Sequence, residues 1–325
     1  MKKRLALILT ILFTAMFFIS CSTSEKTVVN KELNVVVPDG ITAIASAKLI
    51  KEKEELKKDY NINYSIESTP ENIVSQVLKG EADIAIVPSN VAATQYNKNS
   101  GFLIAGTIGW GAMYLVSTDG DKKIEELQNQ EVYNIGKGLT PDLIVRSLLK
   151  DNNINADTDV NLSYVSGVTE LAPLVIAGKT KYAVMPEPAV SQVLTKNNKA
   201  KIIANLNEEW KKVNNSEYGY PQSTVIVKKE LIEEDKEFVE KFLNKLEESC
   251  YFAAEKNSEL PDYCETIGVS TNKSVILTSI ERANINYTPI KECYKEYQTY
   301  YNKLKELDAS TIGGKVPDEE IFMER

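Results

Sequence analysis

One absence decides which chemistry this chain can do. The chain has 325 residues and no histidine, so it cannot form a Ser-His-Asp or Cys-His nucleophile pair, a histidine-ligated zinc site or an imidazole acid or base. Catalysis by carboxylates or by lysine remains possible. The polar and aromatic residues that could contact a ligand lie in predicted loops, and they do not form a catalytic set. We therefore expect a protein that binds a ligand without a metal and without a cofactor.

Two loops that follow predicted strands place polar groups in front of predicted helices. The first loop is Pro38-Asp39-Gly40-Ile41-Thr42, and the second is Pro88-Ser89-Asn90. The first backbone N–H groups of a helix lack partners and can bind an anionic oxygen. The alternative is that the polar side chains only cap the helices. The candidate ligand-binding residues in these loops are Asp39, Gly40, Thr42, Ser89 and Asn90.

A third loop, Gly136-Lys137-Gly138-Leu139-Thr140-Pro141, is rich in glycine and carries a lysine. It lacks the spacing and order of a nucleotide P-loop. We expect a tight turn in which the N–H groups around Gly138 and the Thr140 hydroxyl face a ligand, while Lys137 adds positive charge. The alternative is a plain connection from a strand to a helix.

Three larger side chains complete the candidate site. Trp110 is flanked by glycines, which would let its ring stand against a ligand, although tryptophan more often packs in a core. Glu187 lies between two prolines after a predicted strand and could accept from an amine or amide. Its alternative is a salt bridge at the rim. Tyr220, near Tyr218 and Gln222, could line the mouth of the site or pack at a hinge.

Arginine is scarce, and this limits the classes of ligand that the protein is expected to bind. The four arginines are Arg4, Arg146, Arg282 and Arg325, and only Arg146 stands near a proposed loop. We therefore expect no bidentate guanidinium clamp on an anion. A small, polar and flat molecule fits this expectation better than a multiply charged phosphate.

The hydrophobic pattern predicts the elements that hold these loops. Short apolar runs alternate with helical spacing in the order strand, helix, strand, helix, strand, and this order occurs twice. Such alternation predicts two α/β units, each with a parallel sheet. The predicted strands are 33–37, 62–66, 82–87, 132–135, 160–165 and 182–185, and the predicted helices are 41–56, 71–79, 141–150 and 169–177.

A mature chain of about 300 residues exceeds what one compact core usually supports, so we expect two lobes. Strands at 103–106 and 113–117 would pass to the second lobe, and a strand at 223–227 would return. From residue 230 onward the pattern is helical, and we expect Tyr294, Tyr297 and Tyr301 to form a stripe that packs on the first lobe. The predicted division is a signal peptide at 1–20, a flexible tether at 21–31, lobe 1 at 32–115 and 224–325, and lobe 2 at 116–223.

The N-terminus has the features of a bacterial export signal. Met1-Lys2-Lys3-Arg4 is basic, and the apolar run at 5–19 is shorter than the roughly 20 residues of a membrane span. Phe18-Ile19-Ser20-Cys21 resembles a lipobox, with Phe18 where leucine is usual, and the resemblance implies that Cys21 is lipidated. The alternative is an ordinary secretory signal or an uncleaved anchor. In either case the chain is expected outside the cytoplasm.

The net charge and the number of cysteines further limit the function and the disulfide bonds that the chain can have. With 38 Lys and Arg against 46 Asp and Glu the formal net charge is −8, which is the wrong sign for a general nucleic-acid binder. Besides Cys21, the cysteines are Cys250, Cys264 and Cys293. This odd number allows at most one intramolecular disulfide, and buried apolar positions are the alternative.

Four further motifs follow one another along the chain: Gly80-Glu81-Ala82-Asp83-Ile84-Ala85, Ile124-Glu125-Glu126-Leu127, Pro186-Glu187-Pro188 and Ile312-Gly313-Gly314-Lys315-Val316-Pro317-Asp318. Their order resembles that in the solute-binding proteins of ABC importers, in the family that includes binders of nitrate, taurine, alkanesulfonates and thiamine pyrimidine precursors. The resemblance covers nearly all of the mature chain. It implies a two-lobe Venus-flytrap fold that closes on one solute and delivers it to a permease and its ATPase.

The same resemblance places several loops at positions that contact a ligand. These loops are at Gly40, Ser89, Trp110, 137–140 and Glu187. The first loop departs from the family because it offers little positive charge, which disfavours nitrate or a simple sulfonate.

We therefore predict an α/β protein of two lobes with no enzymatic activity. It would be a monomeric, lipid-anchored binding protein at the extracytoplasmic face of the cell membrane. The predicted ligand is a thiamine-pyrimidine-like heterocycle ahead of an aliphatic sulfonate, because Trp110 offers stacking and Glu187 offers an acceptor. The alternatives are a secreted enzyme that uses Glu187 or Lys137, and a lipoprotein that senses a ligand without a transporter.

Overall fold

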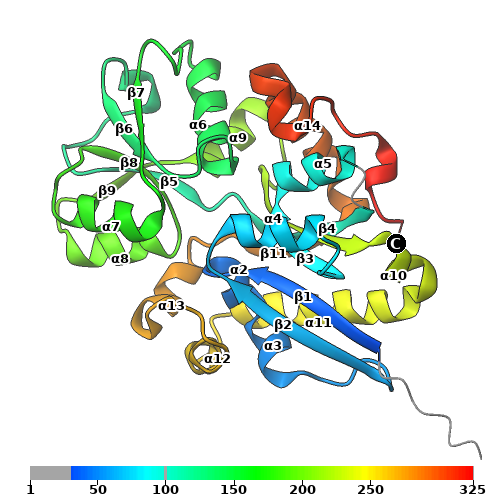
Figure 1. Ribbon diagram of the computed structural model, residues 1–325. Helices are drawn as coiled ribbons and strands as arrows, with labels where there is room; N and C mark the ends of the chain where they lie inside the picture. Colours follow the sequence, from blue (N-terminus) through cyan, green and yellow to red (C-terminus); the bar gives the residue numbers. More distant parts are fainter. Residues whose placement is uncertain (1–30, 99–100, 325) are drawn as a thin grey trace, which may run out of the picture.

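The chain folds around two β-sheets that lie in separate lobes (Figure 1). The computed structural model describes residues 31–98 and 101–324. The predicted signal peptide, nearly all of the predicted tether and Cys21 lie outside the described residues, and the lipidation of Cys21 stays a prediction. Within the described ranges, no helix has the length and apolar character needed to cross a membrane.

The first sheet has six strands: β1 (Lys31–Pro38), β2 (Tyr60–Glu67), β3 (Ile84–Pro88), β4 (Phe102–Trp110), β10 (Pro221–Lys228) and β11 (Ile285–Pro289). Their order across the sheet is β11-β4-β10-β3-β1-β2. β1 pairs in parallel with β2 and β3. β10 runs antiparallel between β3 and β4, and β11 is antiparallel to β4. The predicted strand and helix alternation is confirmed for the parallel part.

The helices between these strands are α2 (Ile41–Ala45), α3 (Ala47–Glu52), α4 (Pro70–Leu78) and α5 (Ser89–Asn97). The single helix predicted at 41–56 is wrong in part, because the chain breaks it at Ser46. The Ser46 hydroxyl donates to the carbonyl oxygen of Thr42 at 3.0 Å, and Lys53 ends α3 in the left-handed conformation.

The second sheet has five strands: β5 (Met113–Ser117), β6 (Glu131–Asn134), β7 (Asn161–Tyr164), β8 (Tyr182–Pro186) and β9 (Lys201–Asn205). Their order is β7-β6-β8-β5-β9. β6 pairs in parallel with β7 and β8, and β5 runs antiparallel to β8 and β9. The helical segments around this sheet are η1 (Ile124–Glu126), α6 (Thr140–Asp151), α7 (Val168–Ile176), α8 (Ala189–Lys196) and α9 (Leu206–Asn214).

Two segments cross between the sheets. β4 leads into β5 through Gly111 and Ala112, and the stretch at 215–220 leads from α9 back to β10. The two crossovers touch each other, since the backbone N–H of Gly111 donates to the carbonyl oxygen of Tyr220 at 3.1 Å. The residues at which the predicted lobes divide stay a prediction.

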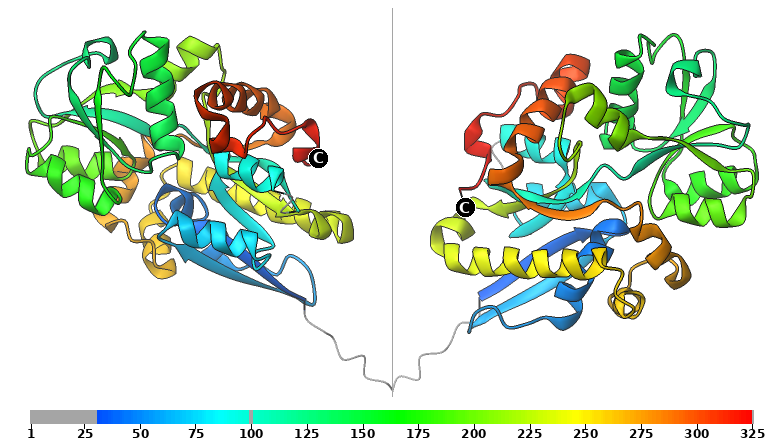
Figure 2. Two further views of the ribbon diagram at one scale, coloured as in Figure 1. Left: turned by 45° about the horizontal axis from the view of Figure 1, so that its top comes forward. Right: turned by 180° about the vertical axis from the view of Figure 1, so that it is seen from behind.

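The C-terminal part is mainly helical, as predicted, but it also contributes β11. Its helical segments are α10 (Lys229–Glu234), α11 (Lys236–Ala254), α12 (Leu260–Ile267), α13 (Lys273–Ile280), α14 (Ile290–Asp308), η2 (Ala309–Ile312) and η3 (Glu319–Ile321). α11 packs against α2, α3 and β11. α14 lies on the other side of the first sheet and also contacts α6 of the second lobe (Figure 2).

Side chains of α14 join the cores of the two lobes. Tyr297 and Tyr301 are buried as predicted, whereas Tyr294 is 38% exposed and does not belong to the stripe. Tyr300, which the prediction did not include, is buried instead of Tyr294. The core under α14 contains apolar residues of both sheets, among them Val36 of β1 and Val132 of β6. The two lobes therefore share one apolar core on the side of α14.

The three described cysteines are free and buried, so the apolar alternative predicted for them is confirmed. Burial raises the pKa of all three thiols above the ordinary cysteine value. They are Cys250, Cys264 and Cys293.

Candidate functional site

Loops that follow the parallel strands of the two sheets meet at the boundary between the lobes. A β-carbon placed on Gly40, after β1, would lie 4.0 Å from Cδ of Pro188, after β8. Asn90, after β3, places its side-chain nitrogen 3.4 Å from the carbonyl oxygen of Gly138, after β6. Ligands of α/β proteins bind at the carboxyl ends of such strands. This boundary is therefore the candidate site.

The loop after β1 is anchored within its own lobe. Oδ1 of Asp39 accepts the backbone N–H groups of Gly40 at 2.7 Å and of Ser270 at 3.1 Å. Gly40 has a φ of 89°, a left-handed conformation that favours glycine. The hydroxyl oxygens of Thr42 and Ser223 lie 3.4 Å apart. The loop thus brings the Thr42 hydroxyl beside the Ser223 hydroxyl of β10, while the Asp39 carboxylate is engaged by backbone N–H groups of its own lobe.

Ser89 and Asn90 begin α5 but serve different contacts. The Ser89 hydroxyl is fully buried and donates to the carbonyl oxygen of Pro221 at 2.7 Å, which ties α5 to β10 inside the first lobe. The Asn90 side chain donates to the carbonyl oxygens of Gly138 at 3.4 Å and Thr311 at 3.3 Å. Asn90 is the member of this pair that reaches the second lobe.

The turn before α6 contributes both exposed and buried groups. Lys137 is exposed, and its ammonium nitrogen lies 5.4 Å from the ring centroid of Tyr164. The Thr140 hydroxyl is buried, 3.5 Å from Oδ1 of Asn90 and 3.3 Å from the hydroxyl of Tyr300. The turn is a strand-to-helix connection, and it also touches the first lobe and α14.

Both aromatic candidates pack inside the crossovers. Trp110 is 3% exposed, stacks on Tyr218 with 4.9 Å between ring centroids, and donates from Nε1 to the Thr288 hydroxyl at 3.1 Å. Tyr220 is fully buried, with its ring edge-on to Trp210 at 5.8 Å. These positions match the packing alternative that the sequence left open for each residue.

Glu187 forms an ion pair across the boundary. Its side chain is fully buried, and Oε1 accepts from Nε of Arg282 at 2.6 Å. Ser191 donates its backbone N–H to Oε2 and its hydroxyl to Oε1, both at 3.1 Å. Burial raises the pKa of the Glu187 carboxyl, although the contacts with Arg282 and Ser191 act in the opposite direction. The salt-bridge alternative for Glu187 describes this structure.

Arg282 is the functional residue that the sequence analysis missed. Its guanidinium also donates from Nη2 to the Ser191 hydroxyl at 2.6 Å, and its carbonyl oxygen accepts from the hydroxyl of Tyr114 at 2.7 Å. Only Arg146 was expected near a loop, because Arg282 is separated from Glu187 by 95 positions and β11, which follows it, was not predicted. The short run Ile285–Pro289 before a proline was the available signal.

Amide side chains hold the two crossovers together. The backbone N–H of Ala112 donates to Oε1 of Gln222 at 2.8 Å. Asn207 accepts the N–H of Tyr220 at 3.1 Å and donates to the carbonyl oxygen of Tyr218 at 3.0 Å. Nε2 of Gln222 has no partner within the described ranges. The crossovers are thereby fixed, while one amide donor is left beside the boundary.

The groups at the boundary can form hydrogen bonds to a ligand. Over residues 31–98 and 101–324, no group of three or more Cys, Asp or Glu side chains could hold a metal ion. The groups gathered there are hydroxyls, an amide, backbone N–H groups and one lysine. Such an arrangement can hold a small polar molecule.

No protein-family model and no curated protein sequence matches this chain. Solved structures do match it over most of its length. A protein from Parabacteroides distasonis described as an ABC transporter is 26% identical, with a TM-score of 0.78 over 91% of this chain and 99% of its own.

Two other matches are sulfonate binders with lower sequence identity. The periplasmic aliphatic sulphonate-binding protein of Escherichia coli is 12% identical, with a TM-score of 0.73 over 91% of this chain and 92% of its own. The alkanesulfonate-binding protein of Xanthomonas axonopodis pv. citri, bound to MOPS, is 12% identical, with a TM-score of 0.65 over 88% of this chain and 94% of its own. At such identity the likeness concerns the fold.

Proposed function

We propose that this chain, which has the two-lobe fold of the periplasmic solute-binding proteins of ABC transporters, captures a small polar molecule between its lobes for an ABC importer. The observation that carries the proposal is the meeting of carboxyl-end loops from both sheets, Gly40 with Pro188 and Asn90 with Gly138. A molecule bound there would touch both lobes at once. Its binding energy would therefore depend on how the lobes are arranged.

Capture follows from a change in the arrangement of the lobes. The crossovers at 111–112 and 215–220 are the covalent links between the sheets, so the lobes would turn about them. A ligand that contacts both lobes shifts the population towards the closed arrangement by its differential affinity. The ion pair of Arg282 with Glu187 and the contact of Asn90 with Gly138 belong to that closed arrangement.

The contacts at the boundary support an aliphatic sulfonate ahead of an aminated heterocycle, which reverses the order predicted from the sequence. The carboxylate of Glu187 is already paired with Arg282, and the Trp110 ring already stacks on Tyr218. Donors remain at the start of α5, where the first N–H groups of the helix have no partner within it and favour an anion. The start of α6 offers only the N–H of Thr140, because Pro141 has none and the Asp142 N–H donates to the carbonyl oxygen of Leu139 at 3.0 Å. Two proteins with the same fold bind sulfonates.

The proposed protein works outside the cytoplasm, anchored through a lipid on Cys21, and acts as a monomer with a permease and its ATPase. The export signal and lipobox in the sequence support the anchor. The proposed division is lobe 1 at 32–115 and 224–325 and lobe 2 at 116–223.

The test is a thermal-shift panel on soluble protein that starts at Ser22. The panel contains taurine, longer alkanesulfonates, nitrate, an aminopyrimidine, thiamine and amino acids. A true ligand at 100 times its dissociation constant adds about 2.7 kcal/mol to the free energy of unfolding. We expect the sulfonates to raise the melting temperature, and Thr42→Ala together with Ser223→Ala to reduce that rise.

Thr266→Ala is the matched control, because it removes an exposed hydroxyl on α12 that donates only to the carbonyl oxygen of Asp262. It should leave the ligand-induced rise unchanged. A rise with the aminopyrimidine alone would restore the order predicted from the sequence. If no compound raises the melting temperature of refolded protein, the proposed ligand classes are wrong.

A further inference from the structure

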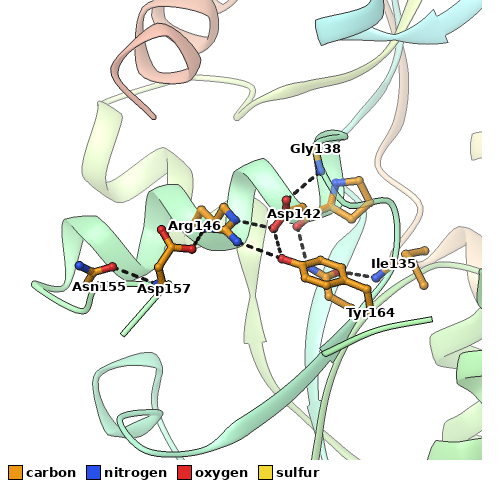
Figure 3. Close-up of polar contacts among 9 residues, drawn as sticks. Ile135, Gly138, Asp142, Arg146, Asn155, Asp157 and Tyr164 are labelled. Carbon is orange, nitrogen blue, oxygen red and sulfur yellow. Dashed lines mark hydrogen bonds and ion pairs between the residues drawn. The ribbon is translucent and has the colours of Figure 1, made fainter. Parts of the chain in front are cut away.

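A buried carboxylate lies directly beneath the turn that faces the first lobe (Figure 3). Asp142, in the first turn of α6, has a side chain that is 4% exposed. Its Oδ2 accepts the backbone N–H of Gly138 at 2.8 Å. We propose that Asp142 is a positioning residue of the ligand site, holding the 136–140 turn in the conformation that meets the other lobe; this rests on the proposed function above.

Besides the Asp142 side chain, the turn is held by hydrogen bonds within it and at the start of α6, where the carbonyl oxygen of Leu139 accepts the N–H groups of Asp142 and Leu143. Gly136 and Gly138 both have positive φ values, of 60° and 76°, which few other residues adopt without strain. Within the turn, the N–H of Leu139 donates to the carbonyl oxygen of Gly136 at 2.8 Å. Two glycines in five residues make such a backbone flexible unless a side chain fixes it. Asp142 supplies that fixed point.

The same carboxylate also reaches the neighbouring strand. The hydroxyl of Tyr164, the last residue of β7, donates to Oδ1 of Asp142 at 2.6 Å. Burial and this hydrogen bond raise the pKa of Tyr164 to about 12, so the hydroxyl keeps its proton at neutral pH. The Lys137 ammonium lies over the same ring. Asp142 therefore couples the turn to the end of β7 at the boundary.

Arg146 places a positive charge beside the buried side chain of Asp142. Its Nε donates to Oδ1 of Asp142 at 2.9 Å, and its Nη2 donates to the Tyr164 hydroxyl at 3.3 Å. Its Nη1 donates outward to Asp157 at 2.7 Å. A carboxylate here accepts three hydrogen bonds, which a neutral amide of the same shape cannot do.

The hydrogen bond from Gly138 to Asp142 sets which backbone groups of the 136–140 turn face the first lobe. The N–H of Gly138 points to Asp142 while its carbonyl oxygen accepts from Asn90 of the first lobe. One peptide unit away, Thr140 contacts the same asparagine. A rotation of the Gly138 backbone would therefore break the contact with Asn90 and re-aim the N–H groups at the start of α6.

The test compares Asp142→Asn with Asp157→Ala in soluble protein from Ser22. The first change leaves one acceptor oxygen for the three donors on Gly138, Tyr164 and Arg146, and the second loses only the outer partner of Arg146. Both should lower the melting temperature. Hydrogen exchange of the 136–140 segment without ligand should become faster only in Asp142→Asn, and its affinity for taurine or a longer alkanesulfonate should fall about tenfold or more.

Unchanged exchange in Asp142→Asn would overturn the inference, as would equal loss of affinity in both variants. Tyr164→Phe is the second variant if Asp142→Asn does not fold: it removes one donor to the carboxylate, and we expect faster exchange with a smaller loss of affinity. If the proposed function itself is wrong, the experiment gives a different result. The wild-type protein would then show a protected turn but no response to any sulfonate, which would overturn the ligand-binding part of the inference alone.

Discussion

Among the contacts that cross the boundary between the lobes, two are built from different chemistry. One is the ion pair of Arg282 with Glu187, whose N–O distance is 2.6 Å and whose carboxylate is fully buried. The other is the set of neutral hydrogen bonds between Asn90 and the start of α6, which are 3.4 to 3.5 Å long. The first is short and charged, with a buried carboxylate and an arginine side chain that is 26% exposed, whereas the second is long and uncharged.

The difference shows which contact makes the closed arrangement specific. A buried ion pair contributes little net stability, but removing one partner leaves a buried charge and is costly. Neutral hydrogen bonds can be lost one at a time at about 1 kcal/mol each. We therefore expect the charged contact to be lost as a unit when its partners separate, and the neutral contact to be lost one hydrogen bond at a time.

The sharpest way to break this comparison is Arg282→Met. It keeps the apolar stem of the side chain but leaves Glu187 buried without a counter-charge. We expect the closed arrangement to lose about 3 kcal/mol, because opening the lobes is what returns the carboxylate to water. Small-angle X-ray scattering should show a larger radius of gyration, and urea unfolding should show lower stability.

The control for this change is the double variant Glu187→Gln with Arg282→Met. It removes both charges, so we expect it to recover most of the loss. A double variant that unfolds as easily as Arg282→Met would show that the arginine acts through packing alone.

A smaller effect is expected from Asn90→Ala on the neutral side. The hydrogen bonds that it removes are long, so the free energy of unfolding should fall by about 1 kcal/mol. Asn97→Ala is the matched control on α5, because Asn97 donates only to the carbonyl oxygens of Ile312 and Lys315 in the first lobe. Scattering should detect a change in lobe separation for Asn90→Ala and none for Asn97→Ala.

The smallest effect is a dependence on pH that belongs to Glu187. Burial raises the pKa of this carboxyl above 4.5 in the folded protein, so the folded state holds the proton more tightly than the unfolded state. Its contribution to stability is therefore fully present below the ordinary pKa of 4.5 and is lost as pH rises through the raised pKa. Contacts with Arg282 and Ser191 oppose the effect of burial on this pKa, so we expect a small change.

Urea unfolding of wild-type protein and Glu187→Gln over this pH range isolates the contribution, because the other titrating groups are common to both. The wild type should gain stability relative to the variant as the solution is acidified. A difference that is constant with pH would mean that Glu187 does not titrate in the folded protein.

The fold was predictable because its strongest signals are local. β1, β3 and β8 are short apolar runs that end at Pro38, Pro88 and Pro186, and such runs mark buried parallel strands. β11 escaped prediction because it lies within a long helical stretch and pairs only with β4, far away in the chain. The break at Ser46 escaped as well, because a single serine is common within helices.

The candidate site was predictable only as a set of loops. Gly40, Asn90 and the 136–140 turn reach the boundary because each follows a parallel strand, which the sequence pattern located. The part played by each side chain was not predictable in the same way. Trp110 and Glu187 looked available for a ligand, yet Tyr218 and Arg282 occupy them.

The sequence by itself determined the alternation of strands and helices, the two lobes and the exclusion of histidine chemistry. These follow from residue type and from spacing along the chain. Only the tertiary structure decided which groups are satisfied by the protein and which remain for a ligand. The physical reason is that a hydrogen bond or an ion pair depends on distances of a few ångströms between residues such as Glu187 and Arg282, and separation along the chain carries no record of such distances.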